Sequence, residues 1–281
     1  MRDGHAHPLR RTLVRVLLVG TLVMGVLTGM LWAFQRQLIY YPDPTAVSPA
    51  SDVIDGARDV TLHTEDGLEL QAWFVPAPQQ SALDMAVLFA PGNGGNRLGR
   101  AGFALQLRRR GFAVLLMDYR GYGGNPGAPS EEGLAADALA AAEALEELGY
   151  PPERTIYFGE SLGTGVVANL HDRRPPAGLV LRSPFTELAD VGAHHYPWLP
   201  VRLLLRDRFP VLELVETSEV PLTVVYGDRD QVVPTELSAR VADGAASLVE
   251  EVVLEGADHN DAVMFGARVA DAVLRLAERV R

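Results

Sequence analysis

The sequence of 281 residues contains neither cysteine nor lysine. Without cysteine, the chain has no thiol nucleophile, no disulfide and no cysteine that could carry a lipid. All 25 basic residues are arginine, so a lysine nucleophile and a Schiff-base mechanism are excluded as well. The lack of cysteine does not by itself identify the cellular compartment.

Basic charge is scarce outside the N-terminal region. The chain has a formal net charge of −11 at pH 7, but residues 1–34 carry four arginines and one aspartate. The rest of the chain therefore carries 21 arginines against 35 acidic residues, a net charge of −14. An acidic surface of this kind repels nucleic acid, so we expect no nucleic-acid partner. Hydrophobic residues make up 48% of the sequence, enough for one large α/β domain with a sizeable core.

One segment is apolar over the length of a membrane span, which is about 20 residues. It covers residues 13–34, and only Arg15 near its start interrupts it. Three further arginines precede the segment, whereas Arg36 alone follows it closely. The positive-inside rule then predicts a cytoplasmic tail over residues 1–12, a single-pass anchor over 13–34 and a domain on the extracytoplasmic side. A cleaved signal peptide is the alternative, although its apolar core would be shorter, and no A-x-A cleavage site follows the segment.

The remainder of the chain divides into a linker and one domain. Residues 35–57 are rich in proline, serine and aspartate without a hydrophobic period, which predicts a linker. The domain over residues 58–281 begins with two alternating segments joined by Asp66-Gly67, a strong hairpin signal. Strand and helix segments then alternate, which predicts a mostly parallel sheet with helices on both faces. The strands are expected at 59–64, 68–75, 85–90, 112–117, 154–158, 179–182, 222–226 and 248–254, and the helices at 96–110, 130–148, 162–170, 235–242 and 262–281.

Residues 184–220 interrupt this alternation and are expected to form a short lid over the edge of the sheet. They contain a dense apolar cluster, which consists of Tyr196, Trp198, Leu199, Leu203, Leu204, Leu205 and Phe209. Exposed apolar patches mark membrane, partner or ligand sites, so one hypothesis is that the lid faces the membrane. The alternative is that the cluster only covers the edge of the sheet. His194 and His195 have no carboxylate at ligand spacing, which favours lid packing over a metal site.

The stretch Gly159-Glu160-Ser161-Leu162-Gly163 has the G-x-S-x-G pattern of a nucleophile elbow, in which a strand turns sharply into a helix and exposes a serine. Gly159 and Gly163 are expected because the backbone passes too close at these positions for a β-carbon. Ser161 is expected in a strained conformation at the N-terminus of the helix, where the helix dipole favours developing negative charge. The alternative is a glycine-rich turn with a serine that does no chemistry.

A serine nucleophile needs a base, and the base needs a carboxylate that holds its tautomer. Asp228 and Asp230 follow the strand expected at 222–226, and His259 follows the strand expected at 248–254. Loops that follow parallel strands gather outside the carboxyl edge of the sheet. These side chains are therefore expected to converge with Ser161.

The order serine, acid, histidine is that of one large superfamily. With these motifs the chain resembles the serine hydrolases of the α/β-hydrolase superfamily, over roughly residues 55–281. It is most similar to a short-lid, N-terminally anchored branch that includes serine aminopeptidase-like, acyl-protein thioesterase-like and monoglyceride-lipase-like enzymes. The resemblance implies the α/β-hydrolase fold, serine hydrolase chemistry, and no cofactor or metal.

The resemblance also implies a role for each residue of the site. The acid is the aspartate of G-x-x-D-x-x-V-P, which falls on Asp230, and the neighbouring Asp228 and Asp258 match less well. The base falls on His259.

An oxyanion hole needs two backbone N–H groups. One is that of Leu162, directly after the nucleophile, and by resemblance the other is that of Asn93, in the loop after the strand at 85–90. Pro91 stands where the family usually has histidine, a departure that concerns the geometry of this loop.

The expected reaction forms an acyl-enzyme on Ser161, which water activated by His259 releases. The expected substrate is a small-molecule or lipid-like ester or thioester. A serine peptidase of the same fold is the enzymatic alternative, although a lid of about 40 residues is small for holding a peptide terminus. A non-catalytic, membrane-tethered binding module is the alternative from another class, because a fold does not dictate a function. The oligomeric state is left open.

Overall fold

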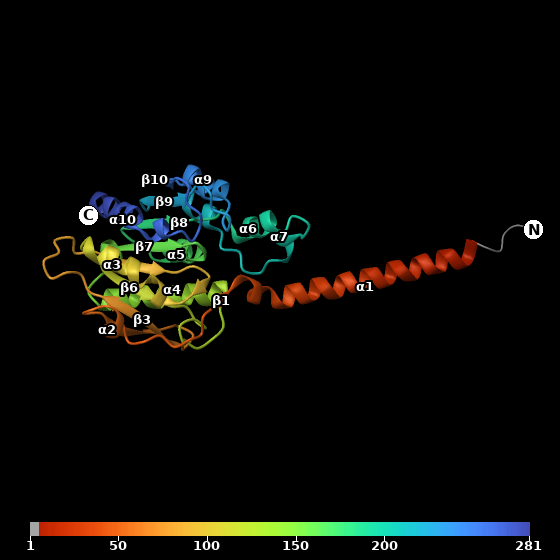
Figure 1. Cartoon of the computed structure of the whole chain (residues 1–281), viewed down its shortest axis with the longest axis horizontal. Coiled ribbons are helices and arrows are strands. Elements are labelled where there is room, and N and C mark those ends of the chain that lie inside the picture. Colours follow the sequence, from red (N-terminus) through yellow and green to blue (C-terminus); the bar gives the residue numbers. More distant parts are fainter. Residues whose placement is uncertain (1–5) are drawn as a thin grey trace, which may run out of the picture. The chain divides into compact units, whose positions relative to one another are not determined.

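The structure, a computed structural model, describes residues 6–281 of the chain (Figure 1). It divides into two compact units, a helical unit that ends at Ile39 and a domain that spans Tyr40–Arg281. The helix α1 covers Ala6–Ile39.

Among the described residues, α1 contains the one stretch that is long and apolar enough to cross a membrane. This stretch is Arg11–Ile39, and its most apolar window of 18 residues has a mean hydropathy of 2.1. The helix extends past both ends of the segment expected at 13–34. At its C-terminal end, Pro42 cannot continue a helix and disfavours helical geometry in the residue before it, so α1 ends within a few residues of this proline.

The domain is built on an eight-stranded sheet with the order β10-β9-β8-β7-β4-β6-β3-β2. The strands are β2 (Arg58–His63), β3 (Glu69–Val75), β4 (Ala86–Ala90), β6 (Ala113–Met117), β7 (Thr155–Glu160), β8 (Gly178–Arg182), β9 (Leu222–Gly227) and β10 (Leu248–Leu254). The β2–β3 hairpin is antiparallel, β3 pairs antiparallel with β6, and all other neighbours are parallel. The predicted fold class, a mostly parallel sheet that begins with a hairpin, is confirmed.

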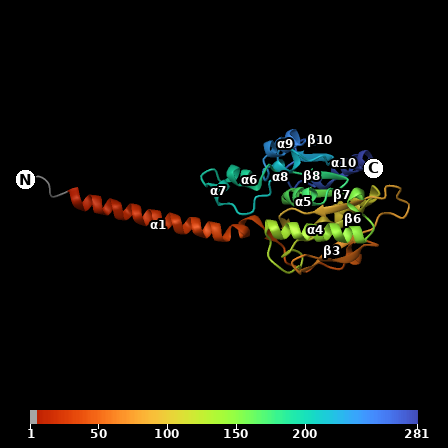
Figure 2. The ribbon, with the colours of Figure 1, turned by 180° about the vertical axis from the view of Figure 1, so that it is seen from behind.

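Helices cover both faces of the sheet. The face toward the viewer in Figure 2 carries α4 (Glu131–Glu147) and α5 (Leu162–Arg173), and α3 (Ala101–Arg109) and α10 (Ala267–Val280) pack on the other face together with α2 (Ala50–Val53). The helix α9 (Thr235–Gly244) lies beside β9. Ser130 begins α4 as an N-cap, because its hydroxyl accepts a hydrogen bond from the N–H of Gly133 at 3.0 Å.

Two expected helices are each divided in the structure. The segment expected at 96–110 begins with the 3-10 turn η1 (Arg97–Arg100) before α3 starts. The closing helix expected at 262–281 consists of the 3-10 turn η3 (Ala262–Phe265) and α10, with Gly266 between them in extended geometry. A single extended residue is enough to break the helical hydrogen-bond ladder, and the hydrophobic pattern does not register it.

The linker expected at 35–57 is wrong for most of its length. Its first residues belong to α1, and residues 40–57 belong to the domain. A short strand, β1 (Tyr41–Pro42), pairs in parallel with β5 (Gly94–Gly95), and both Ala50 and Ile54 are fully buried in the core. The segment shows no hydrophobic period because single, widely spaced residues make its contacts rather than one face of a regular element.

The lid between β8 and β9 contains α6 (Leu188–His195), α7 (Val201–Leu204) and α8 (Val211–Val215). Its base is held firmly, because the carboxylate of Glu131 accepts the N–H groups of Arg208 at 2.5 Å and Phe209 at 2.7 Å. Phe209 is buried against Gly165 of α5. The expectation that it belongs to an exposed apolar cluster is therefore wrong. A β-carbon at Gly165 would lie 2.6 Å from Phe209, which explains why the helix has glycine there.

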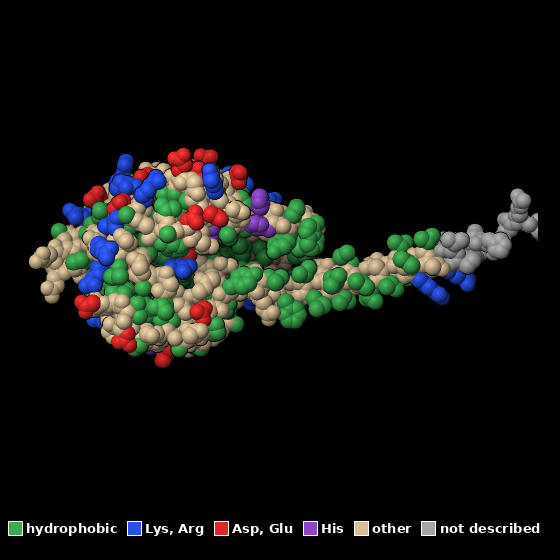
Figure 3. Space-filling view, in the orientation of Figure 1, with side chains coloured by type: hydrophobic (Ala, Val, Ile, Leu, Met, Phe, Trp, Pro, Cys, Tyr) green, Lys and Arg blue, Asp and Glu red, His purple; other side chains and the backbone are tan. Residues whose placement is uncertain are grey.

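The tip of the lid is different in character. Tyr196, Trp198 and Leu203 are 54%, 74% and 85% exposed. Figure 3 shows hydrophobic side chains gathered over α6 and α7, next to exposed histidine. The lid thus has a packed base and an exposed apolar tip, which we call the lid tip (residues 196–205).

Candidate active site

Ser161 lies at the turn between β7 and α5, with φ +50° and ψ −115°. A residue with a side chain adopts such a backbone only where its surroundings enforce it, at a cost of about 1–3 kcal/mol. The close approach behind the turn needs glycine. A β-carbon on Gly163 would lie 2.2 Å from the carbonyl oxygen of Ala90, and a β-carbon on Gly159 would lie 2.6 Å from the carbonyl oxygen of Gly163. The G-x-S-x-G spacing therefore has the steric cause that the sequence indicated.

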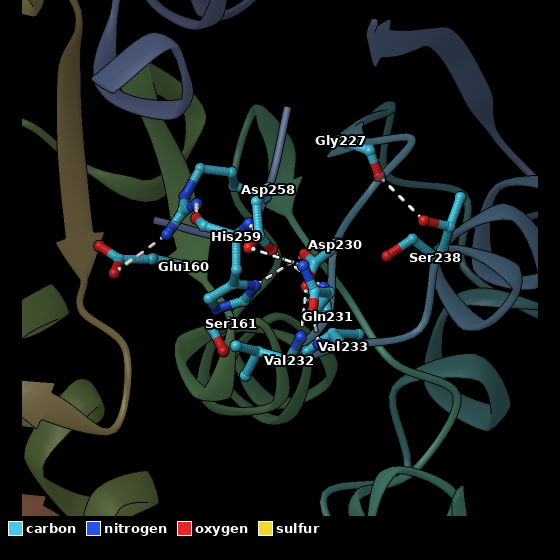
Figure 4. Close-up of polar contacts among 12 residues, drawn as sticks. Glu160, Ser161, Gly227, Asp230, Gln231, Val232, Val233, Ser238, Asp258 and His259 are labelled. Atoms are coloured by element: carbon cyan, nitrogen blue, oxygen red, sulfur yellow. Dashed lines mark hydrogen bonds and ion pairs between the residues drawn. The ribbon is translucent and has the colours of Figure 1, made fainter. Parts of the chain in front are cut away.

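Asp230 and His259 meet at the carboxyl edge of the sheet, and both are almost completely buried (Figure 4). The Nδ1 of His259 lies 2.7 Å from Oδ2 of Asp230, and Oδ1 of Asp230 accepts the N–H groups of Val232 at 2.9 Å and Val233 at 2.8 Å. Burial raises the pKa of Asp230, but the hydrogen bond and charge of His259 and the two amides outweigh it and leave the pKa below its usual value. The carboxylate is thus held ionised, with one oxygen fixed by the backbone and the other toward the imidazole.

The neighbouring aspartates have other partners. Asp228 accepts the N–H of Gly256 at 2.6 Å. Asp258 accepts the N–H of Gln231 at 2.9 Å and that of His259 at 2.7 Å, so it ties the loop after β9 to the loop after β10. Both carboxylates are engaged by the backbone and shape the loops that carry Asp230 and His259.

Arg182, at the end of β8, links Ser161 to His259. Its carbonyl oxygen accepts the N–H of Ser161 at 2.8 Å, and its Nη1 donates to the carbonyl oxygen of His259 at 3.0 Å. The guanidinium is fully buried and lies 3.0 Å from the carboxylate of Glu160, an ion pair without hydrogen-bond alignment. Arg100 binds the same carboxylate with two hydrogen bonds of 2.7 and 2.6 Å. The nucleophile loop and the histidine loop therefore share one buried cluster of charges.

This buried cluster is not among the groups that the sequence predicts. Burial raises the pKa of Glu160, but the charges of Arg182 and Arg100 outweigh it and hold the pKa below its usual value. The ring of Phe265 lies 5.2 Å from the guanidinium carbon of Arg100 and 4.5 Å from that of Arg182, which adds cation–π contacts. One signal was available: an arginine that ends an apolar strand must be paired when buried.

The two predicted oxyanion donors lie on adjacent loops. Leu162 is the first residue of α5, and Asn93 lies in the loop after β4. The loops touch, since a β-carbon at Gly163 would lie 2.7 Å from the carbonyl oxygen of Pro91. That same carbonyl accepts the hydroxyl of Tyr119 at 2.8 Å, which fixes the loop where the family usually has histidine.

Four other histidines that the structure describes, His63, His171, His194 and His195, make different contacts. Nε2 of His195 is 2.9 Å from the carbonyl oxygen of Val232, and the His194 ring packs edge-on against that of His195. His171 is buried in α5, with Nδ1 bonded to a backbone carbonyl, and His63 lies exposed on β2. Among the side chains that the structure describes, from residue 11 onward, no group of three metal-ligating residues comes together.

Comparisons with known proteins agree with this architecture. The protein MT2364 of Mycobacterium tuberculosis is 48% identical over 267 residues, which is 94% of each chain. A family model described as serine aminopeptidase, S33, matches residues 81–214. The α/β-hydrolase domain-containing protein WAV2 of Arabidopsis thaliana is 27% identical over 237 residues, 76% of each chain. This chain belongs to the α/β-hydrolase superfamily.

The solved structure of another protein has the same fold as this α/β-hydrolase. The Pyrococcus furiosus esterase Pf2001 superposes with a TM-score of 0.67 at 21% sequence identity, and the match covers 86% of this chain and 97% of that one. At this identity the likeness concerns the fold alone. The roles of individual residues rest on the geometry of the site.

Proposed function

We propose that this α/β-hydrolase cleaves carboxylic esters or thioesters through an acyl-enzyme on Ser161. His259 is the general base and acid, and Asp230 holds its ring in the tautomer with hydrogen on Nδ1. The observation that carries the proposal is the buried 2.7 Å contact between His259 and Asp230, on loops that Arg182 joins to the elbow of Ser161.

In the first half-reaction, Oγ of Ser161 attacks the carbonyl carbon while Nε2 of His259 accepts its proton. The electron pair of the C=O bond moves to oxygen, which the N–H groups of Leu162 and Asn93 stabilise. Collapse of this intermediate expels the alcohol or thiol, and His259 returns the proton to it. In the second half-reaction water attacks the acyl group by the same steps, which releases the carboxylic acid and restores the serine hydroxyl.

The primary test uses the full-length protein, a fluorophosphonate probe and p-nitrophenyl esters. The wild type should be labelled and should hydrolyse the esters, and Ser161→Ala should lose both properties while keeping its thermal unfolding midpoint. Labelling at another residue, or an unlabelled wild type without esterase activity, would show that the protein is a binding module or uses another centre.

We place the domain on the extracytoplasmic side of a membrane, tethered by α1 with its N-terminus in the cytoplasm. Tethering is useful for an amphiphilic substrate, because a bilayer concentrates such molecules. The exposed lid tip matches this substrate class, since Trp198 and Leu203 offer apolar surface to an acyl chain. The substrates proposed here are therefore lipid-like acyl esters or thioesters.

Acyl-chain length gives a direct test. Activity in liposomes should rise from acetyl to dodecanoyl esters, and Trp198→Ala or Leu203→Ala should lower it only on the long substrates. Val253→Ala, which removes a half-exposed apolar side chain on β10, is the matched control. Equal losses on short and long esters would argue against a chain-binding lid.

A peptidase is the second candidate, because the matching family model is described as a serine aminopeptidase. The same elbow and base can cleave an amide. Aminoacyl p-nitroanilides measured beside the matching esters separate the two functions, and faster anilide cleavage would favour the peptidase.

A further inference from the structure

The loop that carries Asn93 is rich in glycine. Its sequence Pro91-Gly92-Asn93-Gly94-Gly95 contains three glycines, and Gly95 has φ +82°. Glycine loses more conformational freedom on ordering than any other residue. An oxyanion donor works only when it is held in place before the reaction starts, so this loop needs external support.

We infer that residues 40–46, the first residues after α1, position two parts of the domain. One is the loop of residues 91–95 that carries Asn93, which we call the oxyanion loop, and the other is the base of the lid. We call residues 40–46 the strap. The inference rests on the proposed function, in which the N–H of Asn93 binds the oxyanion. The strap residues are positioning residues, since they act through the loop and not on the substrate.

The first contact of the strap is a two-stranded sheet. β1 pairs with β5 in the register Tyr41 to Gly94 and Pro42 to Gly95, and within residues 6–281 this pair is separate from the eight-stranded sheet. The N–H of Tyr41 donates to the carbonyl oxygen of Asn93 at 2.9 Å. The oxyanion loop therefore takes its β-pairing from the strap.

Asp43 adds a second set of contacts. Its carboxylate accepts the side-chain N–H of Asn96 at 3.0 Å, its N–H donates to the carbonyl oxygen of Gly95 at 3.3 Å, and its carbonyl oxygen accepts the N–H of Gly123 at 2.8 Å. The strap continues over Gly124, where a β-carbon would lie 3.1 Å from Ala46. Asp43 thus joins the loops after β4 and β6.

Tyr40 extends the strap to the lid. Its hydroxyl donates to Oδ2 of Asp207 at 2.9 Å, and both side chains are 3% exposed. Asp207 directly precedes Arg208 and Phe209, the residues that Glu131 holds. One short segment therefore supports the oxyanion loop and the base of the lid, and it follows the last residue of α1 without a spacer.

The test compares two substitutions at Tyr41 in the full-length protein. Tyr41→Pro removes the N–H that binds Asn93, whereas Tyr41→Ala keeps it and loses only a side chain that is 58% exposed. A displaced catalytic group can cost about a hundredfold in rate. On a short soluble ester, Tyr41→Pro should lower kcat by about tenfold to a hundredfold with KM nearly unchanged, and Tyr41→Ala should match the wild type.

Asp43→Ala is a second variant that leaves the backbone donors in place. It should lower kcat severalfold, and it decides the question if Tyr41→Pro does not fold. Wild-type kcat in a folded Tyr41→Pro, or in Asp43→Ala if the proline variant is unfolded, would overturn the inference. The wild type tests the proposed function separately. A wild type that neither hydrolyses esters nor is labelled at Ser161 would refute the proposed function rather than the role of the strap.

Discussion

Replacing Asp230 with asparagine tests its proposed role, which is to hold the tautomer of the base His259, more sharply than removing the side chain would. Oδ1 of Asp230 accepts two N–H groups, from Val232 and Val233, so the amide oxygen of asparagine must occupy that position. The amide NH₂ is then directed at Nδ1 of His259, in place of the oxygen now 2.7 Å away. Because an NH₂ can only donate, Nδ1 must become an acceptor and the ring proton moves to Nε2.

This tautomer cannot accept the proton of Ser161. In other triads the corresponding change lowers kcat by about 10⁴, which corresponds to about 5.5 kcal/mol of transition-state stabilisation. The assay is kcat on a p-nitrophenyl ester with the full-length protein. The rate of fluorophosphonate labelling gives a second measure of serine activation and should fall in parallel.

Two matched controls make the prediction specific. Asp228→Asn and Asp258→Asn change carboxylates on the same loops that accept backbone N–H groups. Each should cost far less than Asp230→Asn, since asparagine can still accept those hydrogen bonds through its amide oxygen. An equal loss in either control, or near-normal kcat in Asp230→Asn, would refute the assignment of Asp230.

The remaining predictions concern the elbow. Gly163→Ala places a β-carbon 2.2 Å from a backbone oxygen and should cost about 1–3 kcal/mol or more of unfolding free energy along with most of the activity, whereas Gly102→Ala in α3, with open space around it, should be neutral or slightly stabilising. Both are measured by urea unfolding, and a neutral Gly163→Ala would contradict the steric argument. Glu160→Gln leaves the two arginines without their counter-charge and should cost about 3–5 kcal/mol at pH 7. Because folding lowers the pKa of Glu160 below its usual 4.5, its contribution is complete above that pH and is lost as the pH falls through the folded value. The gap between wild type and variant should therefore narrow below pH 4.5, and a gap that widens there would contradict the ionised state.

Much of the fold could be predicted from the sequence, because the relevant signals are local. A strand and a helix differ in hydrophobic period, and alternation of the two indicates a parallel sheet. The G-x-S-x-G spacing around Ser161 reflects a steric constraint within five residues, so the amino-acid sequence alone reveals it. The positions of Asp230 and His259 after strands likewise follow from the rule that such loops meet at one edge.

Other features depend on pairings between distant residues. Arg100, Glu160 and Arg182 form one charge cluster from three separate elements, and no local pattern specifies which arginine meets which acid. The strap lies within residues 35–57, where the composition predicts a linker, because its role depends on pairing with residues 94–95, far along the chain. Phe209 was expected in an exposed cluster, whereas Gly165 on α5 provides the space that buries it.

The sequence by itself therefore determined the fold class, the elbow and the candidate side chains, since each is encoded by the spacing of nearby residues. Only the tertiary structure decided which groups contact one another: His259 with Asp230, Asp258 with the loop backbone, and the strap with the oxyanion loop. The physical reason is that a hydrogen bond or an ion pair depends on distances of about 3 Å, and the packing of the whole domain sets those distances.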